Sequence, residues 1–329
     1  FAGHKALGDW QAALGINLRC PHLAWYTMEA EAKRDYPAAI SWQSPWWQAY
    51  PKVEDYFARV HAATSRGAEV RDLLVVHPVE STWLMVRPGW LDDPGVKRFD
   101  LQLVALEDAL LGAHIDFDYG DEEILSRRAA VAKTGPVLKV GKAAYTTVLV
   151  PPTVTLRCTT VSLLERFAAA GGRVVFAGEP ADHVDAQPSE RAVALAARAV
   201  RAPASGAELI KAVEPARRVS ITDSAGNEVA AALSLLVEDT DSFVLFICNT
   251  GLEGAERLRD IFDEPRVVER RAAYPTVAVR LLAKTAGRPV ELDPDTGATW
   301  TAEAAQDAGG RWTVSTSLPV LGSRLFVFP

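Results

Sequence analysis

The chain has 329 residues, of which 49% are hydrophobic and 23% are charged, so it is long enough for two or three globular domains. The net charge of −7 argues against non-specific nucleic-acid binding, which needs a basic surface. No apolar run reaches the ~18–20 residues of a membrane helix, and no secretory signal opens the chain. The three cysteines form no C-x-x-C pair, so we expect free thiols in a cytoplasmic protein with no membrane partner.

The chain opens on a helical pattern. Leu7, Trp10 and Leu14 share one helical face, and Gly15 follows as a natural C-terminal stop. The apolar run 16–18 comes next and is a strand candidate. Because the first residue already lies close to this helix, we expect the chain to be part of a longer protein.

A second helix is predicted before Gly67. Ser44 and Pro45 suit a helix start, with serine as the N-cap and proline in the first turn. Four apolar residues then follow the helical period: Val53, Tyr56, Phe57 and Val60. Residues 1–67 therefore read as helix, strand, long loop and helix, which is typical of the end of a (β/α)-type barrel.

Residues 68–204 alternate between strand and helix patterns. The strand candidates are residues 73–76, 114–117, 145–150 and 173–177. Two helical stripes separate them, formed by Phe99, Leu103, Leu106 and Leu110 and by Val161, Leu164 and Phe167. This alternation predicts a doubly wound parallel sheet, and the Ala/Arg-rich stretch 189–211 is predicted to be a helical connector.

Residues 205–329 are rich in strand patterns. The runs are 219–222, 231–237, 243–248, 277–282 and 325–328, and turn signals such as Gly309-Gly310 separate them. No helical stripe interrupts the runs after residue 217. A β-sandwich is therefore expected. The predicted fold class is α/β followed by β.

The stretch from His22 to Trp47 is the strongest functional signal. It reads HLAWYTMEAEAKRDYPAAISWQSPWW and has no amphipathic period. Aromatic faces stack on the C–H groups of sugars and planar polar groups bind hydroxyls, so this composition indicates a carbohydrate site. Six residues are candidates for contacting substrate or fixing the loop: His22, Trp25, Tyr26, Arg34, Asp35 and Trp46. In the alternative interpretation, Trp46 and Trp47 simply pack against a helix start and Tyr36-Pro37 is a turn. Glu29 and Glu31 have the spacing of an acid pair, but we expect solvated side chains there and not catalysts.

Other patterns resemble known functional motifs but lack residues that those motifs need. The acidic run from Asp116 begins D-x-D-x-G like a calcium loop, but Arg127 stands where that loop needs its closing glutamate. Ser81 lacks the G-x-S-x-G elbow of a hydrolase, and Cys158 lacks the flanking glycines of a strained nucleophile turn. No G-x-G-x-x-G or G-x-x-x-x-G-K turn is present. We therefore expect no metal and no cofactor.

Three stretches resemble the C-terminal part of large bacterial (β/α)₈-barrel glycoside hydrolases. They are LGDWQAALGINLRCPHLAWYTMEAEAKRDYPAAISWQSPWW from Leu7, DLLVVHPVESTW from Asp72, and ELDPDTGATW from Glu291 with GSRLFVF from Gly322. In this group, which includes the α-L-rhamnosidase-like proteins of family 106 and the β-galactosidases of family 42, a glutamine-amidotransferase-like sheet domain and β-sandwiches follow the barrel.

The resemblance implies that residues 1–67 are the seventh helix, eighth strand and eighth helix of a barrel, with the catalytic carboxylates upstream of Phe1. The six loop residues would then border the sugar pocket, because barrel sites lie at strand C-terminal ends. It also implies that residues 68–204 are amidotransferase-like in architecture, without the nucleophile motif. The expected function is hydrolysis of glycosidic bonds by a possible homo-oligomer. The alternative is a non-catalytic carbohydrate-binding or assembly module, and a third reading, an amidase or transferase in the sheet domain, rests on architecture alone.

Overall fold

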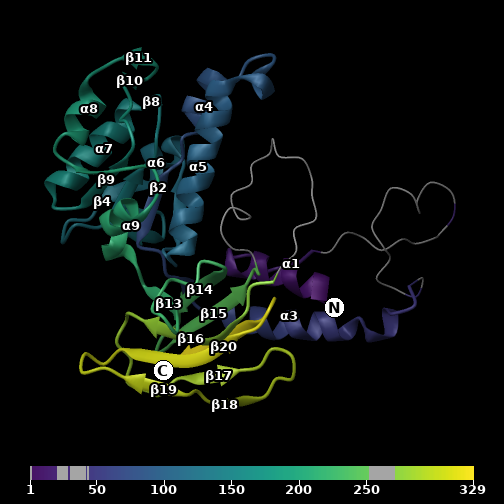
Figure 1. The fold of residues 1–329 in the computed structure, drawn as a ribbon. Coiled ribbons are helices and arrows are strands. Elements are labelled where there is room, and N and C mark those ends of the chain that lie inside the picture. Colours follow the sequence, from purple (N-terminus) through teal and green to yellow (C-terminus); the bar gives the residue numbers. More distant parts are fainter. Residues whose placement is uncertain (1, 21–28, 30–41, 43, 252–270) are drawn as a thin grey trace.

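A computed structural model describes residues 2–20, 29, 42, 44–251 and 271–329 of the chain. It contains a parallel α/β part and an antiparallel β part, and two N-terminal helices pack on the latter (Figure 1). No helix in the described ranges is both long enough and apolar enough to cross a membrane.

The α/β part is built on a five-stranded sheet in which every neighbouring pair is parallel. Its strands lie in the order β12-β9-β7-β2-β3. Their bounds are β2 Leu73–Val76, β3 Phe117–Gly120, β7 Thr147–Val150, β9 Arg173–Ala177 and β12 Val200–Ala202. Numbered along the chain the order is 2-1-3-4-5, the flavodoxin-like arrangement, and the predicted parallel sheet is confirmed.

Helices cover both faces of this sheet because its strands alternate apolar side chains between them. Val76, Val148 and Phe176 face one core, and Val75, Leu149 and Val175 face the other. The first core is closed by α6 Glu122–Arg128, α7 Cys158–Ala169 and α8 Arg191–Ala196. The second is closed by α5 Pro94–Gly112, α9 Ala207–Val213 and the 3₁₀ turn η3 Glu214–Ala216.

Short elements complete the α/β part. Two further helical pieces are α4 Val79–Met85 and η2 Trp90–Asp92. One small sheet contains β4 Ala129–Val131, β5 Leu138–Val140 and β6 Ala143–Tyr145. Another contains β8 Thr155–Leu156, β10 His183–Val184 and β11 Gln187–Pro188. Both lie outside the parallel sheet, and the sequence pattern predicted neither.

The β part consists of two facing sheets, as predicted. The six-stranded sheet has the order β1-β14-β15-β21-β17-β18, with bounds Ala68–Glu69, Ala232–Glu238, Phe243–Asn249, Ser323–Phe328, Val290–Leu292 and Thr299–Thr301. The four-stranded sheet has the order β13-β16-β20-β19, with bounds Val219–Asp223, Tyr274–Leu281, Trp312–Leu318 and Ala304–Gln306. Leu245 and Ile247 of β15 point into the core between the sheets.

The outer face of the six-stranded sheet is covered by two helices, α1 Ala2–Ala13 and α3 Pro51–Thr64. Val244 and Phe246 of β15 point toward them, which explains why this strand is apolar on both faces. The described part of residues 1–67 contains no strand, and its assignment to a barrel stays a prediction.

Several local predictions are wrong in position. Ile16 and Leu18 are exposed coil and not strand, since no described strand pairs with them and an isolated strand leaves its backbone groups unsatisfied. The predicted strand at 114–117 begins three residues later, because His114 has φ of 57° and turns the chain. The predicted connector 189–211 contains the edge strand β12, which pairing with β9 holds extended.

Candidate functional site

The six predicted site residues divide into two groups. His22, Trp25, Tyr26, Arg34 and Asp35 lie outside the residues that the structure describes. Trp46 is described: it precedes the 3₁₀ turn η1 (Trp47–Ala49), its carbonyl oxygen accepts the N–H of Ala49 at 2.9 Å, and its side chain is 52% exposed. Whether these six side chains meet around one pocket therefore stays a prediction.

The predicted helix start at Ser44-Pro45 is wrong. Ser44 is buried, and the α-helix begins at Pro51, where proline occupies the first turn after Tyr50. Proline is favoured in the first turn of a helix, so Pro45 and Pro51 both suit a helix start. The apolar residues that pack on the sheet follow Pro51, and the helix begins there. Trp46 and Trp47 thus belong to a short turn ahead of α3, with both indoles substantially exposed.

Helix α1 presents its apolar stripe to the outside. Leu7 and Trp10 of the helix and Leu14 directly after it are exposed, whereas Gly8 and Ala12 on the opposite face are buried against α3 and the sheet. The helix itself was predicted correctly, but the small residues proved to be its packing face. A row of exposed apolar side chains on one face is typical of a surface that contacts another polypeptide.

A buried polar network ties both N-terminal helices to the sheet. The hydroxyl of Tyr56 in α3 donates to Asp9 Oδ1 of α1 at 2.8 Å and lies 2.6 Å from the hydroxyl of Ser323 in β21. Lys5 bonds Asp9 and also Ser323, the latter at 2.8 Å. Burial raises the pKa of Asp9, and the charge of Lys5 with hydrogen bonds from its partners opposes that rise. The network therefore positions both helices on the sheet.

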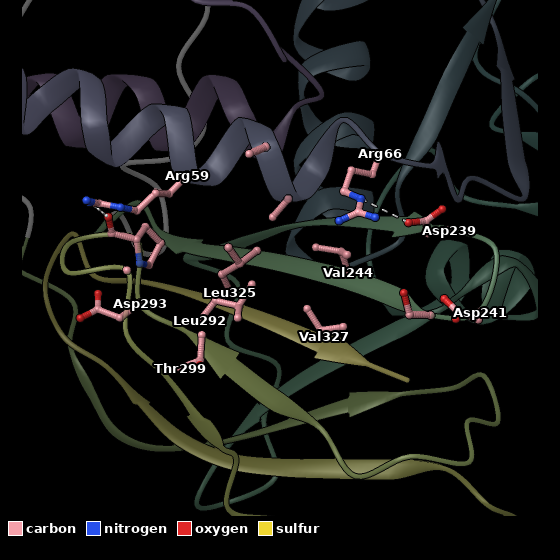
Figure 2. Close-up of a pocket in the computed structure, with 15 residues that line it drawn as sticks. Arg59, Arg66, Asp239, Asp241, Val244, Leu292, Asp293, Thr299, Leu325 and Val327 are labelled. Carbon is pink, nitrogen blue, oxygen red and sulfur yellow. Dashed lines mark hydrogen bonds and ion pairs between the residues drawn. The ribbon is translucent and has the colours of Figure 1, made fainter.

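A groove of about 410 Å³ runs between α3 and the six-stranded sheet (Figure 2). Ala62 and Ala63 line it from the helix side, and their small side chains leave the space open. Its floor consists of branched residues of the sheet: Val244, Leu292, Leu325 and Val327. The volume lies in the ~300–1,000 Å³ range of small-molecule sites.

Two arginines lie at the ends of this groove, Arg59 within α3 and Arg66 two residues after the helix ends. Arg59 donates to the carbonyl oxygen of Pro294 at 2.9 Å, and Arg66 lies 3.6 Å from a carboxylate oxygen of Asp239 (Figure 2). The carboxylate of Asp293 accepts hydrogen bonds within its own turn. The polar groups of the groove therefore hold loops in place, and the arrangement suits binding of an apolar surface better than acid–base chemistry.

The remaining sequence candidates have structural roles. Asp116 and Asp118 both bond Arg71, at 2.9 and 3.1 Å, and Asp121 caps α6, so this acidic run stabilises a strand end and a helix start. Ser81 is fully buried, and its hydroxyl accepts the backbone N–H groups of two residues near β8. Within the described ranges no three acidic, cysteine or histidine side chains gather as metal ligands.

Sequence comparisons place the chain in no family, since neither a family model nor a curated protein matches it. Structure comparison does find a relative in fold. A rhamnosidase from Novosphingobium sp. PP1Y superposes with a TM-score of 0.65 at 16% identity, over 98% of this chain and 29% of that one. The chain has a glycoside-hydrolase-like fold. It spans less than a third of that rhamnosidase.

Two other solved glycosidases superpose with lower TM-scores. An α-L-fucosidase isoenzyme from Paenibacillus thiaminolyticus matches with a TM-score of 0.49 at 13% identity, over 86% of this chain and 51% of that one. A GH42 β-galactosidase from G. stearothermophilus matches with a TM-score of 0.45 at 12% identity, over 86% of this chain and 43% of that one.

Proposed function

We propose that this chain is the C-terminal part of a longer glycoside hydrolase that cleaves O-glycosidic bonds of a carbohydrate substrate. The observation that carries the proposal is the similarity to the rhamnosidase along 98% of the chain. Hydrolysis of this kind uses two carboxylates on either side of an oxocarbenium-like transition state. In this proposal both lie upstream of Phe1, and residues 22–47 form part of the rim of the sugar pocket.

The orientation of α1 and α3 supports a barrel origin for residues 1–67. His4 lies beside Tyr50, with ring centroids 5.8 Å apart, and Asp9 bonds Tyr56 further along both helices. The two helices therefore run parallel. Successive helices of a βα repeat are parallel in this way, because all the strands run in one direction and each helix returns in the other.

The other two units have accessory roles in this proposal. The boundaries predicted after residues 67 and 204 shift, because β1 (Ala68–Glu69) pairs with β14 and because α9 and η3 close the core of the parallel sheet. In this proposal the α/β part from β2 to η3 is an amidotransferase-like domain without amidase chemistry, and β1 with the strands from β13 to β21 forms the β-sandwich. The exposed thiols of Cys20 and Cys158 suit a reducing compartment, which we take to be the cytoplasm. No cofactor is required, because carboxylates alone supply the acid, base and nucleophile of this reaction.

Steady-state kinetics of the full-length protein on aryl α-L-rhamnosides, aryl α-L-fucosides and aryl β-D-galactosides tests the proposal. We expect turnover of at least one of them and a fall in kcat/KM in Trp46→Ala. The matched control is Trp300→Ala, because Trp300 is similarly exposed but lies on β18 of the sandwich. Absence of turnover on every substrate would refute hydrolysis, and an equal effect of both substitutions would refute the role of Trp46.

The exposed stripe on α1 favours a second candidate, a non-catalytic assembly module. Leu7, Trp10 and Leu14 would then contact a second copy or another protein. Sedimentation of the full-length protein separates the two functions. Self-association that Trp10→Glu abolishes, together with sugar binding without turnover, would support the assembly module.

A further inference from the structure

A second pocket lies at the C-terminal edge of the parallel sheet and has a volume of about 530 Å³. Residues that follow β2 and β7 line it, among them Glu80 and Trp83 after the first strand and Thr155 and Arg157 after the second. These two strands are neighbours, and the chain turns to opposite sides of the sheet after them. Ligands of open α/β sheets bind at this switch point, outside the carboxyl ends of the strands.

One wall of this switch-point pocket is apolar and firmly held. Trp83 and Leu84 of α4 line it, and the indole of Trp83 is 66% exposed. The helix that carries them is anchored by Ser81, whose buried hydroxyl accepts the N–H groups of Val154 at 3.0 Å and Thr155 at 3.2 Å. An exposed indole on an anchored helix presents a flat apolar face at little cost in conformational entropy.

The polar wall of the pocket consists of Glu80, from the same helix α4, with Arg157 and Asp185. Arg157 donates to Glu80 Oε1 at 2.5 Å, and the Asp185 carboxylate accepts the N–H of Cys158 at 3.0 Å. Asp185 and Ala186 form the tight turn between β10 and β11 with φ of 49° and 59°, values that non-glycine residues rarely adopt. This turn is fixed by a 3.0 Å hydrogen bond from the N–H of Ala186 to the hydroxyl of Thr155.

The charges at this wall restrict the class of ligand. The guanidinium of Arg157 is already paired, and a second carboxylate lies on the same wall, so an anion is disfavoured. Glu80 is paired with Arg157, and Asp185 accepts the neutral N–H of Cys158, so the wall keeps one negative charge that no cation of the chain neutralises. Both carboxylates keep lone pairs that can accept hydroxyl groups. The hydrogen bond with Asp185 raises the pKa of the Cys158 thiol, which disfavours a thiolate nucleophile.

We propose that the switch-point pocket binds a neutral sugar ring. The C–H face of the ring stacks on Trp83, and its hydroxyl groups bond Glu80, Arg157 and Asp185. This site lies in the α/β part, and its existence does not depend on the proposed hydrolysis. The chain would thereby hold a carbohydrate at a second position, through binding alone.

Binding of L-rhamnose, L-fucose and D-galactose to the protein, measured by calorimetry and by the indole N–H signals in NMR spectra, tests this proposal. We expect saturable binding of at least one sugar, a shift of the Trp83 signal, and binding at that site weakened about tenfold or more in Trp83→Ala. Because Trp83 is mostly exposed, this variant should fold, and Trp300→Ala serves as the control that retains affinity.

Each contrary result has a defined meaning. Failure of all three sugars to shift the Trp83 signal, or equal affinity of Trp83→Ala and the parent, would overturn the proposal. Preference for D-galactosamine over D-galactose would indicate a cation site and also overturn it, as would self-association that Trp83→Ala abolishes. If Trp46→Ala loses hydrolysis while sugar still shifts the Trp83 signal, the result supports the proposed role of Trp46 in hydrolysis and also supports a separate sugar site at Trp83.

Discussion

Two glycines in the same helix should respond in opposite directions to replacement by alanine. Gly8 and Gly3 both lie in α1, where alanine is favoured over glycine by up to about 1 kcal/mol. A Cβ atom added at Gly3 meets nothing within 4 Å, but one added at Gly8 would lie under 3.0 Å from three ring atoms of Phe57. The contact at Gly8 therefore sets how closely α1 approaches α3.

The ring of Phe57 has no room to move away. It is 2% exposed, Tyr56 packs on it edge-to-face with ring centroids 4.9 Å apart, and the guanidinium of Arg19 lies 3.9 Å from its centroid. Overpacking of this kind costs about 1–3 kcal/mol. After subtracting a gain in helix propensity of about 1 kcal/mol, we expect Gly8→Ala to lower the free energy of unfolding of this region by up to about 2 kcal/mol. Gly3→Ala should leave it unchanged or raise it slightly.

Hydrogen–deuterium exchange of the α1 amides is the suitable assay, because a protein with several structural parts need not unfold in one step. Gly8→Ala should speed exchange throughout α1, and Gly3→Ala should not. Circular dichroism provides the check that both variants keep their helix content. Equal protection in the two variants would refute the close approach of α1 to α3, and with it the network that joins both helices to the sheet.

Three further predictions concern buried or hydrogen-bonded groups. Tyr56→Phe should lower the free energy of unfolding by about 1–3 kcal/mol in urea titrations, because it leaves buried Asp9 without one of its donors. Asn249→Ala should cost a similar ~1–3 kcal/mol, since the side-chain amide donates to three carbonyl oxygens; an unchanged urea midpoint would contradict this. Asp185→Asn should speed alkylation of Cys158 at neutral pH, because the aspartate raises the pKa of the thiol and so lowers the thiolate fraction. The two alkylation rates, measured by mass spectrometry, should converge at pH values above both pKa values.

The elements that were predicted correctly depend on local pattern. The apolar runs at residues 73–76 and 173–177 are short strands bounded by turn residues, and α3 and α7 follow the 3.6-residue period. Neighbouring residues along the chain contain this information. The elements that were missed, such as β12 and the strands of the two small sheets, are two or three residues long and exist because a partner strand lies beside them.

The candidate site divides in the same way. Composition alone points to the aromatic loop 22–47, but most of that loop lies outside the described residues, and its role stays a prediction. Neither pocket was predicted, although the sequence shows the small residues Ala62 and Ala63 and the indole of Trp83 that line them. Their significance depends on what faces them across the fold, which one stretch of sequence does not contain.

The sequence by itself determined the main periodicities, the change from α/β to β, and a carbohydrate-like loop composition, because propensity and hydrophobic period act over a few residues. Only the tertiary structure decided the order of the strands, the face that α1 buries and the walls that meet at the switch point. The physical reason is that burial and hydrogen bonding join residues distant in the chain, as Tyr56 and Ser323 show at 2.6 Å.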